Sequence, residues 1–579
     1  MKSKFEYFKE GHPPETDKNR MWPLYGAGID NLGKNGEMIE KPLPEYGPDE
    51  LLVRHDACGL CFSDIKVIRL GQDHPRIYRD MKKNPIVLGH EVTMTVVGVG
   101  ENLKNQYSRG ERFILQADIY VDGVGYAYGY EIQGGLSEYN VIDQRILNGD
   151  GGNYLIPVKP GTGYAESALV EPWACVIAAY SLKYRTSLKP GGAAWFIGPE
   201  PKRDFKISSG FDEATHPAVL KLTDMNGQFG KNLRERAAEL GMQIVEIESV
   251  PEQAQPSDKD LCDDIILLDP SAELIEKASP FLDFHGIMAL LTQEKLEREV
   301  QIDVGRIHYN RWLYIGGNGN DISSIYSSVP VRSSLKKGGR AFFIGAGGPM
   351  GRMHVQHAIE AENRPSVIVC SDVSDERLED LRVSFADEAG EKGIEWICVN
   401  PLNKEAYVEK MSRFEKEGFD DIIMLAPIPA VISDASRWLA EKGVMNIFAG
   451  VARGTTASIN LNDTIFKDVR IIGHSASSIE DMVTMLNKVE SGSLSSNRSV
   501  AAIGSLEAVP DGLQALMEAK FPGKVVIYPH IKPLPLTGLP ELKERLPSVF
   551  AKLRNGREWT KEAERELLAQ MLENERDGK

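Results

Sequence analysis

Cysteine is scarce in this sequence. Six cysteines occur among 579 residues, too few and too scattered for a framework of disulfides. No stretch approaches the roughly 18 continuous apolar residues of a membrane span, and Met1–Glu10 lacks the apolar segment and small-residue cleavage site of a signal peptide. These absences argue against a disulfide-stapled secreted domain and a membrane-spanning protein, and they predict a location in the reducing cytoplasm.

Positive charge is also in deficit. Lysine and arginine number 67 against 84 aspartates and glutamates, which gives a formal net charge of −17. Such a balance favours solubility and disfavours a non-specific nucleic-acid partner or an anionic membrane surface. The hydrophobic share of 42% is that of an ordinary globular protein, and the length predicts three or four domains.

The chain changes character near residue 188. Before it, short apolar runs lie between Gly, Pro and Asn turns, which is typical of a β-rich domain. After it, short β runs alternate with amphipathic helical stretches, which predicts βαβ units and parallel sheets. The expected fold class is therefore α/β, with a β-rich domain over residues 1–188 that a later β-type segment, 501–530, completes. Residues 531–579 are charged and helix-prone, and an exposed amphipathic helix is expected over 551–573.

The α/β part contains an internal repeat. Four short segments recur in the same order, 147 to 157 residues later, and these pairs are Lys189–Gly198 with Lys336–Gly345, Asp263–Leu268 with Asp420–Leu425, Gly286–Met288 with Gly443–Met445, and Ile315–Gly316 with Ile472–Gly473. Two α/β segments can also share strand composition without being repeats. The ordered matches favour two tandem Rossmann-like, doubly wound domains, at 189–334 and 335–500.

Three short pieces in the β-rich part carry metal-ligand chemistry. They are Cys58-Gly-Leu-Cys61-Phe-Ser63-Asp64, Gly89-His90-Glu91 and Glu171-Pro172. Thiolate, imidazole and carboxylate are ligands that zinc selects, and a catalytic site uses three of them. Alone, each piece has an ordinary explanation: a redox pair or half of a structural zinc site, a hydrogen-bonded core histidine, and a turn residue.

Together and in this order, the three pieces resemble the zinc-containing medium-chain dehydrogenase/reductase family. The sorbitol and polyol branch, in which the third piece is Glu-Pro, is the most similar, and the stretch after the cysteine motif is similar to the sorbose-1-phosphate reductase type. The resemblance implies a GroES-like catalytic domain, one catalytic zinc ion and bound NAD. It implies hydride transfer between NAD and a polyol or sugar, sugar phosphates included.

Carried over residue by residue, the resemblance implies Cys61 and His90 as zinc ligands, with either Glu91 or Glu171 as the third and the other close by. Ser63 would pass the substrate proton outward, and Asp64 would orient the site. Cys58 and Cys175 lie outside the ligand pattern and are expected in the core.

The sequence departs from the family pattern in two places. Residues 113–138 hold no cysteine, so the structural zinc of many relatives is expected to be absent. Lys66 stands where several relatives have a histidine in the proton relay, which leaves the outer end of that relay open. His74 and Arg76 follow, and they either reach a substrate phosphate or hydroxyls or belong to a solvated loop.

A glycine-rich turn in the second repeat predicts the nucleotide site. The strand-like run Ala341–Ile344 leads into Gly345-Ala-Gly-Gly-Pro-Met-Gly351, and a helix is expected over 352–360. Such a turn lets backbone amides approach a pyrophosphate at a helix N-terminus. Gly348 and Gly351 match the second and third glycines of the dinucleotide fingerprint, so the first falls at Ala346. The candidate cofactor contacts are Gly345, Gly347, Gly348, Pro349, Met350, Gly351, Asp372 and Arg377.

Asp372 follows the second strand of that repeat and lies 24 residues after Gly348. A carboxylate there accepts the ribose hydroxyls and repels a 2′-phosphate, which favours NAD over NADP. The first repeat has no such turn, because Gly198 is followed by Pro-Glu-Pro-Lys-Arg-Asp. Asp224 occupies the position that corresponds to Asp372, and a cap or turn role is expected for it.

Two other functions stay open: a zinc-free reductase of the quinone-reductase kind, and a non-catalytic protein for nucleotide binding or assembly. Relatives commonly dimerise by joining two Rossmann sheets edge to edge. Since unpaired sheet edges are normally covered, residues 189–334 are expected to dock against 335–500 as an internal pseudo-dimer. A separate contact within a homo-oligomer is the alternative.

Overall fold

The computed structural model describes residues 4–198, 204–252, 256–327 and 332–572. They form two compact units. The first unit consists of residues up to 177 together with 348–353 and the segment from 476 onward, and the second unit consists of 178–347 and 354–475. None of the helices in these described stretches is both long enough and apolar enough to cross a membrane.

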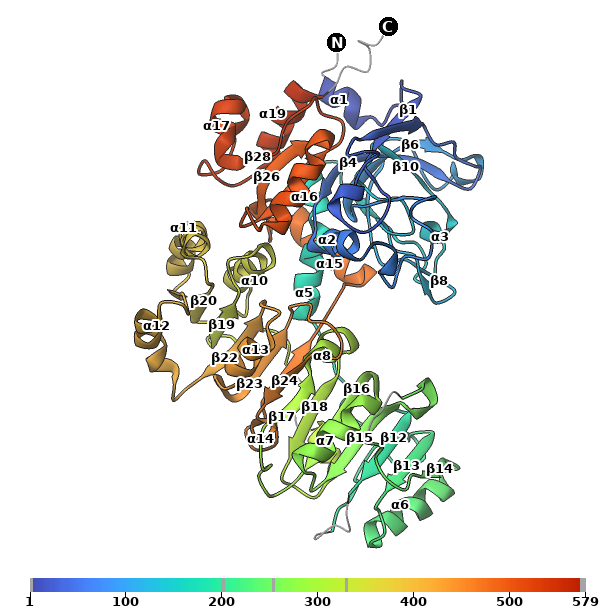
Figure 1. The fold of residues 1–579 in the computed structure, drawn as a ribbon, viewed down its shortest axis with the longest axis vertical. Coiled ribbons are helices and arrows are strands. Elements are labelled where there is room, and N and C mark those ends of the chain that lie inside the picture. Colours follow the sequence, from blue (N-terminus) through green and yellow to red (C-terminus); the bar gives the residue numbers. More distant parts are fainter. Residues whose placement is uncertain (1–3, 199–203, 253–255, 328–331, 573–579) are drawn as a thin grey trace. The chain divides into compact units, whose positions relative to one another are not determined.

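The first unit is built on one mixed sheet of eight strands (Figure 1). Seven of them follow the order β11-β7-β6-β4-β27-β26-β28, and β10 pairs with β4. The central strand β4, Leu51–Gly59, is buried along its whole length. The other strands are β6 (Glu91–Val99), β7 (Arg112–Leu115), β10 (Tyr139–Ile142), β11 (Leu155–Val158), β26 (Val500–Ser505), β27 (Lys524–Tyr528) and β28 (Thr537–Gly538).

Shorter elements surround this sheet. Three two-stranded pairs are formed by β1 (Lys18–Met21) with β3 (Ile39–Pro42), β2 (Pro23–Leu24) with β5 (Ile86–Val87), and β8 (Tyr120–Val121) with β9 (Val124–Gly125). The helices are α1 (Lys4–Lys9), α2 (Phe62–Leu70), α3 (Gln144–Leu147), α4 (Tyr164–Ala168), α5 (Val170–Ala179), α15 (Ile479–Ser491), α16 (Val509–Met517), α17 (Leu542–Arg545), α18 (Pro547–Phe550) and α19 (Lys561–Met571).

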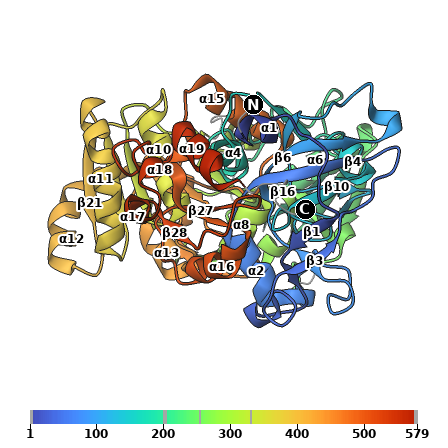
Figure 2. The same cartoon turned by 90° about the horizontal axis from the view of Figure 1, so that it is seen from above.

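The C-terminal segment differs from the expected exposed helix. Helices α17, α18 and α19 pack together (Figure 2), and only α19 has more than two turns. The inner face of α19 is buried. On that face, Glu564 accepts the backbone N–H groups of Tyr164 and Ala165 and the hydroxyl of Tyr528. The prediction of an exposed helix over 551–573 was wrong because an apolar stripe and one capping carboxylate dock the segment onto the sheet domain.

The second unit contains two six-stranded parallel sheets of the same topology. Their strand orders, β14-β13-β12-β15-β16-β18 and β21-β20-β19-β22-β23-β25, both follow the doubly wound order 3-2-1-4-5-6. The expected α/β class is therefore confirmed. The strands of the first sheet are β12 (Ala193–Ile197), β13 (Val219–Thr223), β14 (Gln243–Glu246), β15 (Cys262–Leu268), β16 (Leu282–Leu291) and β18 (Leu313–Gly317). Those of the second are β19 (Arg340–Ile344), β20 (Val367–Ser371), β21 (Glu395–Val399), β22 (Phe419–Met424), β23 (Leu439–Ile447) and β25 (Arg470–Gly473).

The two repeats differ in the connection between their first and second strands. The second repeat has α10 (Pro349–Glu360) between its first two strands, whereas residues 204–218 of the first repeat contain no helix. The other helices of the first repeat are α6 (Gln228–Glu239), α7 (Ala272–Ala278), α8 (Val304–Asn310) and α9 (Ile322–Ser327), and those of the second are α11 (Asp375–Glu391), α12 (Lys404–Met411), α13 (Pro429–Ser436) and α14 (Leu461–Phe466).

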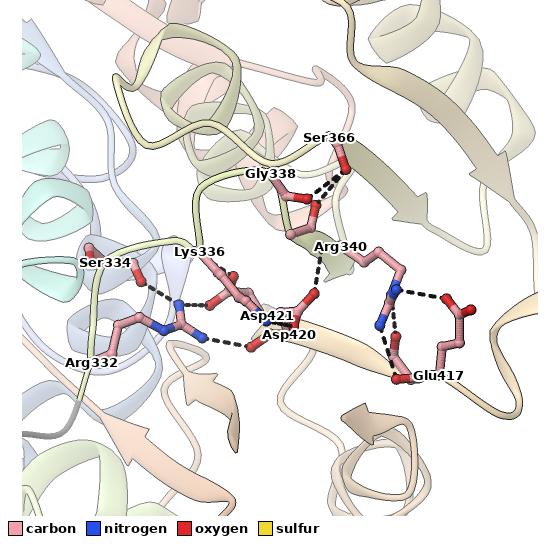
Figure 3. A network of polar contacts seen from close by, with 11 residues as sticks. Arg332, Ser334, Lys336, Gly338, Arg340, Ser366, Glu417, Asp420 and Asp421 are labelled. Carbon is pink, nitrogen blue, oxygen red and sulfur yellow. Dashed lines mark hydrogen bonds and ion pairs between the residues drawn. The ribbon is translucent and has the colours of Figure 1, made fainter. Parts of the chain in front are cut away.

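The recurring sequence motifs build the same ion network twice, with buried aspartates and partly exposed cations. In the second repeat, Arg332 donates to Asp421 and to the carbonyl of Ser334, and Lys336 donates to Asp420 (Figure 3). In the first repeat, the corresponding residues make the corresponding contacts: Arg185 with Asp264 and the carbonyl of Ser187, and Lys189 with Asp263. The Asp-Asp-Ile-Ile and Lys-x-Gly-Gly motifs therefore tie the start of the fourth strand to the segment that leads into the first.

The two repeats meet edge to edge inside the second unit. A short antiparallel ladder joins β17 (Val300–Asp303) to β24 (Thr456–Ile459). The contacts are reciprocal: helix α14 packs against β18 and helix α8 against β25. Gly316 on β18 lets Ile465 approach, and Gly473 on β25 lets Ile307 approach in the same way. One hydrophobic core runs through both repeats, so the contact is broad and apolar.

Candidate functional site

Two antiparallel strands of the first unit bring the predicted zinc ligands together. The last residue of β4, Gly59, lies opposite Glu91, the first residue of β6. A Cβ at Gly59 would lie 2.2 Å from Glu91 Oε2, so only glycine lets this carboxylate cross the strand. Two residues later, Cys61 forms the N-cap of α2. Register and turn together place Cys61 beside the His90–Glu91 pair.

The three side chains form a compact donor set. One ligand atom each from Cys61, His90 and Glu91 lies within 4.8 Å of the others. Glu91 Oε2 is buried and has no hydrogen-bond partner among the described residues. A buried carboxylate oxygen without a partner, next to a thiol and an imidazole, fits a bound cation, and this donor set suits zinc. The sequence left Glu91 and Glu171 open as the third ligand, and the geometry groups Glu91 with the other two.

Asp64 and Ser63 surround this donor set. Asp64 accepts the backbone N–H of Cys61 at 2.9 Å, and its Oδ1 lies 3.3 Å from His90 Nδ1. Burial opposes a charged imidazole, but the charges of Asp64 and Cys61 raise the pKa of His90 well above its usual value. Ser63 Oγ lies 3.0 Å from both Cys61 Sγ and His90 Nε2. Its hydroxyl is therefore placed to exchange a proton at the donor set.

Lys524 is a site residue that the sequence did not single out. It begins β27 and donates from Nζ to Glu91 Oε1, and both side chains are buried. Burial alone would lower the pKa of Lys524, but Glu91 and Cys61 raise it above its usual value. The pair holds one oxygen of Glu91 and leaves the other to the donor set. The available signal was a lone lysine at the head of the apolar run Val525–Tyr528.

Glu171 lies near the donor set. The cluster of possible metal ligands found among the described residues does not include it. It occupies the first turn of α5. Burial, helped by the charge of Glu91 and opposed by that of His90, raises the pKa of Glu171 to about 7. Cys58 and Cys175 also lie outside the donor set, and burial raises the pKa of both thiols well above the usual value.

The loop after α2 is folded against the same region. Arg76 donates from Nη1 to Asp118 at 2.5 Å, and its backbone N–H donates to His74 Nδ1 at 3.3 Å. The ring of His74 meets that of Tyr130 edge-on at 5.1 Å. The pKa of His74 is lowered, first by burial and then by the charges of Arg76 and Lys66. His74 and Arg76 are therefore half-buried and packed beside the donor set, while Gln72, Asp73 and Pro75 of the same loop are exposed.

The glycine-rich turn of the second repeat has the tight bend at Gly345, with φ +83°. The N–H groups of Gly345 and Ala346 both donate to the carbonyl of Ser371. Helix α10 then begins at Pro349, three residues earlier than expected, so Met350 and Gly351 lie in its first turn. The assignment of the first fingerprint position to Ala346 misses this bend, because a left-handed backbone conformation favours Gly345.

The carboxylate of Asp372 faces this turn. Its Oδ2 accepts the N–H of Gly347 at 2.9 Å, and its Oδ1 accepts the N–H of Ser374 at 3.0 Å. A Cβ at Gly347 would meet both Asp372 Oδ2 and Arg377 Cβ, whereas one at Gly348 would meet nothing within 4 Å. The position of a Cβ at Gly348 is therefore open, whereas Gly347 is tightly packed against Asp372 at the carboxyl end of β20.

Known proteins match both parts of this description. The sequence model of the alcohol dehydrogenase GroES-like domain matches residues 47–148. Mannitol-1-phosphate 5-dehydrogenase of Aliivibrio fischeri is 24% identical over 544 residues, which cover 91% of this chain and 93% of the relative. L-sorbose 1-phosphate reductase of Klebsiella pneumoniae is 26% identical over 317 residues, 51% of this chain and 75% of the relative.

A solved structure matches the fold as well. The crystal structure of 2R,3R-butanediol dehydrogenase from Bacillus subtilis aligns with a TM-score of 0.51 at 15% identity, over 88% of this chain and 99% of that one. At this identity the likeness concerns the fold alone. The GroES-like domain expected from the sequence is thus confirmed, together with the parallel-sheet architecture that follows it.

Proposed function

The chain carries the GroES-like domain and the fold of the medium-chain dehydrogenase/reductase family, and on this premise we propose that it is a zinc-dependent oxidoreductase. It would transfer a hydride between NAD and a polyol or sugar, phosphorylated forms included. The observation that carries the proposal is the donor set of Cys61, His90 and Glu91 with its unpartnered buried oxygen. The names of two relatives, for a polyol phosphate and a ketose phosphate, support the substrate class.

Each residue has a definite task in this proposal. Zinc, when bound, lowers the pKa of the substrate alcohol, and NAD carries the redox chemistry. Cys61, His90 and Glu91 would hold the metal, while Lys524 would hold one carboxylate oxygen of Glu91 in place. Asp64 fixes the backbone of Cys61 and the imidazole. Ser63 Oγ would pass the proton of the substrate hydroxyl outward, accepting it as its own O–H proton leaves in the opposite direction.

Metal analysis combined with an activity panel tests the proposal. We expect one zinc per chain and NADH formation, followed by absorbance, with at least one polyol or polyol phosphate. Activity without zinc would favour the quinone-reductase kind of enzyme. Zinc and NAD binding without any turnover would favour a nucleotide-binding or assembly protein. A ratio near two zinc ions per chain would contradict the expected absence of a structural zinc.

Asp372 should set the preference for NAD over NADP. Asp372→Asn removes the negative charge and is expected to raise the KM for NAD about 10- to 100-fold, because a hydrogen bond to a charged group contributes about 1.5–3 kcal/mol. The ratio of kcat/KM for NAD to that for NADP should fall as well, since the repulsion of a 2′-phosphate is lost.

Asp224→Asn in the first repeat is the matched control for this change. Asp224 has φ +57°, a conformation that asparagine tolerates, and no glycine cradle accompanies it, so NAD kinetics should stay as in the wild type. A wild-type enzyme that uses NADP better than NAD would disprove the role given to Asp372.

We also propose that the edge-to-edge contact of the two repeats serves as an internal pseudo-dimer. It occupies the sheet edges that relatives pair between chains, so the protein is expected to be a monomer of 64.1 kDa. Light scattering coupled to size exclusion measures this directly. A stable dimer at micromolar concentration would show that the chain forms a separate homo-oligomer contact.

A further inference from the structure

Arg76, Lys66 and His74 lie close together beside the donor set, and one aromatic ring connects them to it. The ring of Tyr130 is 5.1 Å from the His74 ring, 5.7 Å from the guanidinium carbon of Arg76 and 6.3 Å from the ring of His90. Lys66, on α2, is near enough for its charge to act on His74. Arg76 and Lys66 are positively charged and His74 adds a neutral imidazole, so this group of nitrogen donors suits an anionic ligand.

Only one of the three guanidinium nitrogens of Arg76 donates a hydrogen bond among the described residues. Nη1 donates to Asp118, but Nε and Nη2 are both buried without a hydrogen-bond partner among the described residues. Buried charged donors left in this state are costly, so each needs an explanation. Nε–H and Nη2–H point the same way and form the fork that binds two oxygens of one phosphate.

Gly125 and Tyr120 lie against the fork. A Cβ at Gly125, on β9, would lie 3.1 Å from Tyr120 Cε1, 3.4 Å from Arg76 Nε and 3.5 Å from Nη2, so the fork adjoins a residue without a side chain. The ring of Tyr120 is 5.7 Å from the guanidinium carbon and is 41% exposed. A phosphate that reaches the fork would have to displace this half-exposed ring.

The position of Arg76 relative to the donor set suits a substrate that extends to the metal site. The counter-ion of Arg76 is Asp118, whose charge also acts on Glu171, next to the donor set. The Tyr130 ring lies 5.7 Å from the guanidinium carbon of Arg76 and 6.3 Å from the ring of His90, so one small ligand could reach from Arg76 to the donor set along this ring. A phosphate offers three oxygens, enough for the fork and for Lys66 or His74 in addition, whereas a carboxylate offers two.

We infer that Arg76, with Lys66 and His74, forms an anion subsite for the phosphate of a phosphorylated polyol or sugar whose alcohol or carbonyl group sits at the metal. The inference rests on the proposed function and deepens it, since it makes Arg76 the residue that selects phosphorylated substrates. Gly125 provides the space and Tyr130 the wall between the phosphate and the metal ligands.

Kinetics with paired substrates test the subsite. The measured quantity is the ratio of kcat/KM for a hexitol 1-phosphate to that for the same hexitol. In the wild type this ratio should be well above one. Arg76→Gln should lower it about 100-fold or more, since two charge-assisted hydrogen bonds are lost. Arg76→Lys should restore only part of it, because lysine cannot form the fork.

Arg79→Gln is the matched control. Arg79 lies three residues further on, and its donors are already bound to Glu131, so the ratio should stay at the wild-type value. Gly125→Ala should lower the ratio without removing any charge, because the new methyl group fills the space in front of the fork. A purely structural role of Arg76 would lower both substrates alike and leave the ratio unchanged, which overturns the inference.

Binding of inorganic phosphate separates this inference from the proposed function. Calorimetry on the zinc-loaded wild type should detect phosphate binding that Arg76→Gln abolishes and Arg79→Gln retains. If no substrate of the panel is oxidised but this pattern holds, the proposed function fails and the anion subsite stands. If hexitols are oxidised, but with no preference for the phosphate and no loss of phosphate binding in Arg76→Gln, only the subsite fails.

Discussion

Cys61→Ala is expected to lower kcat/KM by about a thousandfold or more and to reduce the bound zinc well below one per chain. A metal-bound oxygen gains several kcal/mol of charge stabilisation, and each 1.4 kcal/mol corresponds to a factor of ten in rate. His90→Ala should behave in the same way. Both variants should keep the fold, because the strands β4 and β6 remain paired through their backbones. Activity and zinc content measured on the same sample check this.

Cys58→Ala and Cys175→Ala are the matched controls, since both thiols lie outside the donor set, Cys58 buried and Cys175 partly buried. They should retain zinc at the wild-type ratio and lose far less activity than Cys61→Ala. The assignment of the donor set would be wrong if Cys61→Ala kept its zinc and its activity while one of the other two variants lost both.

Lys524→Met is expected to lower the free energy of unfolding of the first unit by about 3–5 kcal/mol in the metal-free protein. The substitution leaves the Glu91 carboxylate buried and unpaired, and breaking a buried ion pair in this way carries a penalty of that size. Urea unfolding, with hydrogen exchange of β6 and β27 as the local probe, measures it. Added zinc should restore part of the loss, because a cation at the donor set again balances the charge of Glu91.

Lys18→Met is the control for this prediction. Lys18 and Glu40 form the same kind of pair at 2.6 Å, also across two strands, but both side chains are more than half exposed. Exposed pairs contribute little to stability, so this variant should unfold close to the wild type. Equal urea midpoints for Lys524→Met and Lys18→Met would mean that Glu91 carries no buried charge for Lys524 to balance.

Several features of the fold were predictable from local sequence. The recurring Lys-x-Gly-Gly and Asp-Asp-Ile-Ile motifs indicated a duplication, and both copies build the same ion network. Figure 3 shows the second copy. The glycine-rich turn before α10 was recognisable because turns depend on neighbouring residues. The exact boundaries of this turn and helix were less predictable. The helix starts at Pro349 rather than at 352, and a boundary of this kind depends on how the first turn packs.

The candidate site was also predictable from the sequence only in part. By itself, the sequence determined the types of ligand that are available, a thiol, an imidazole and a carboxylate in short motifs, because these chemical identities are fixed residue by residue. Tertiary structure alone decided which carboxylate joins the set, since the register of β4 against β6 puts Gly59 opposite Glu91. It also brought Lys524 to Glu91 and left the fork of Arg76 without a partner. These pairings join residues far apart in the chain, and no local pattern of spacing specifies which distant strands will become neighbours.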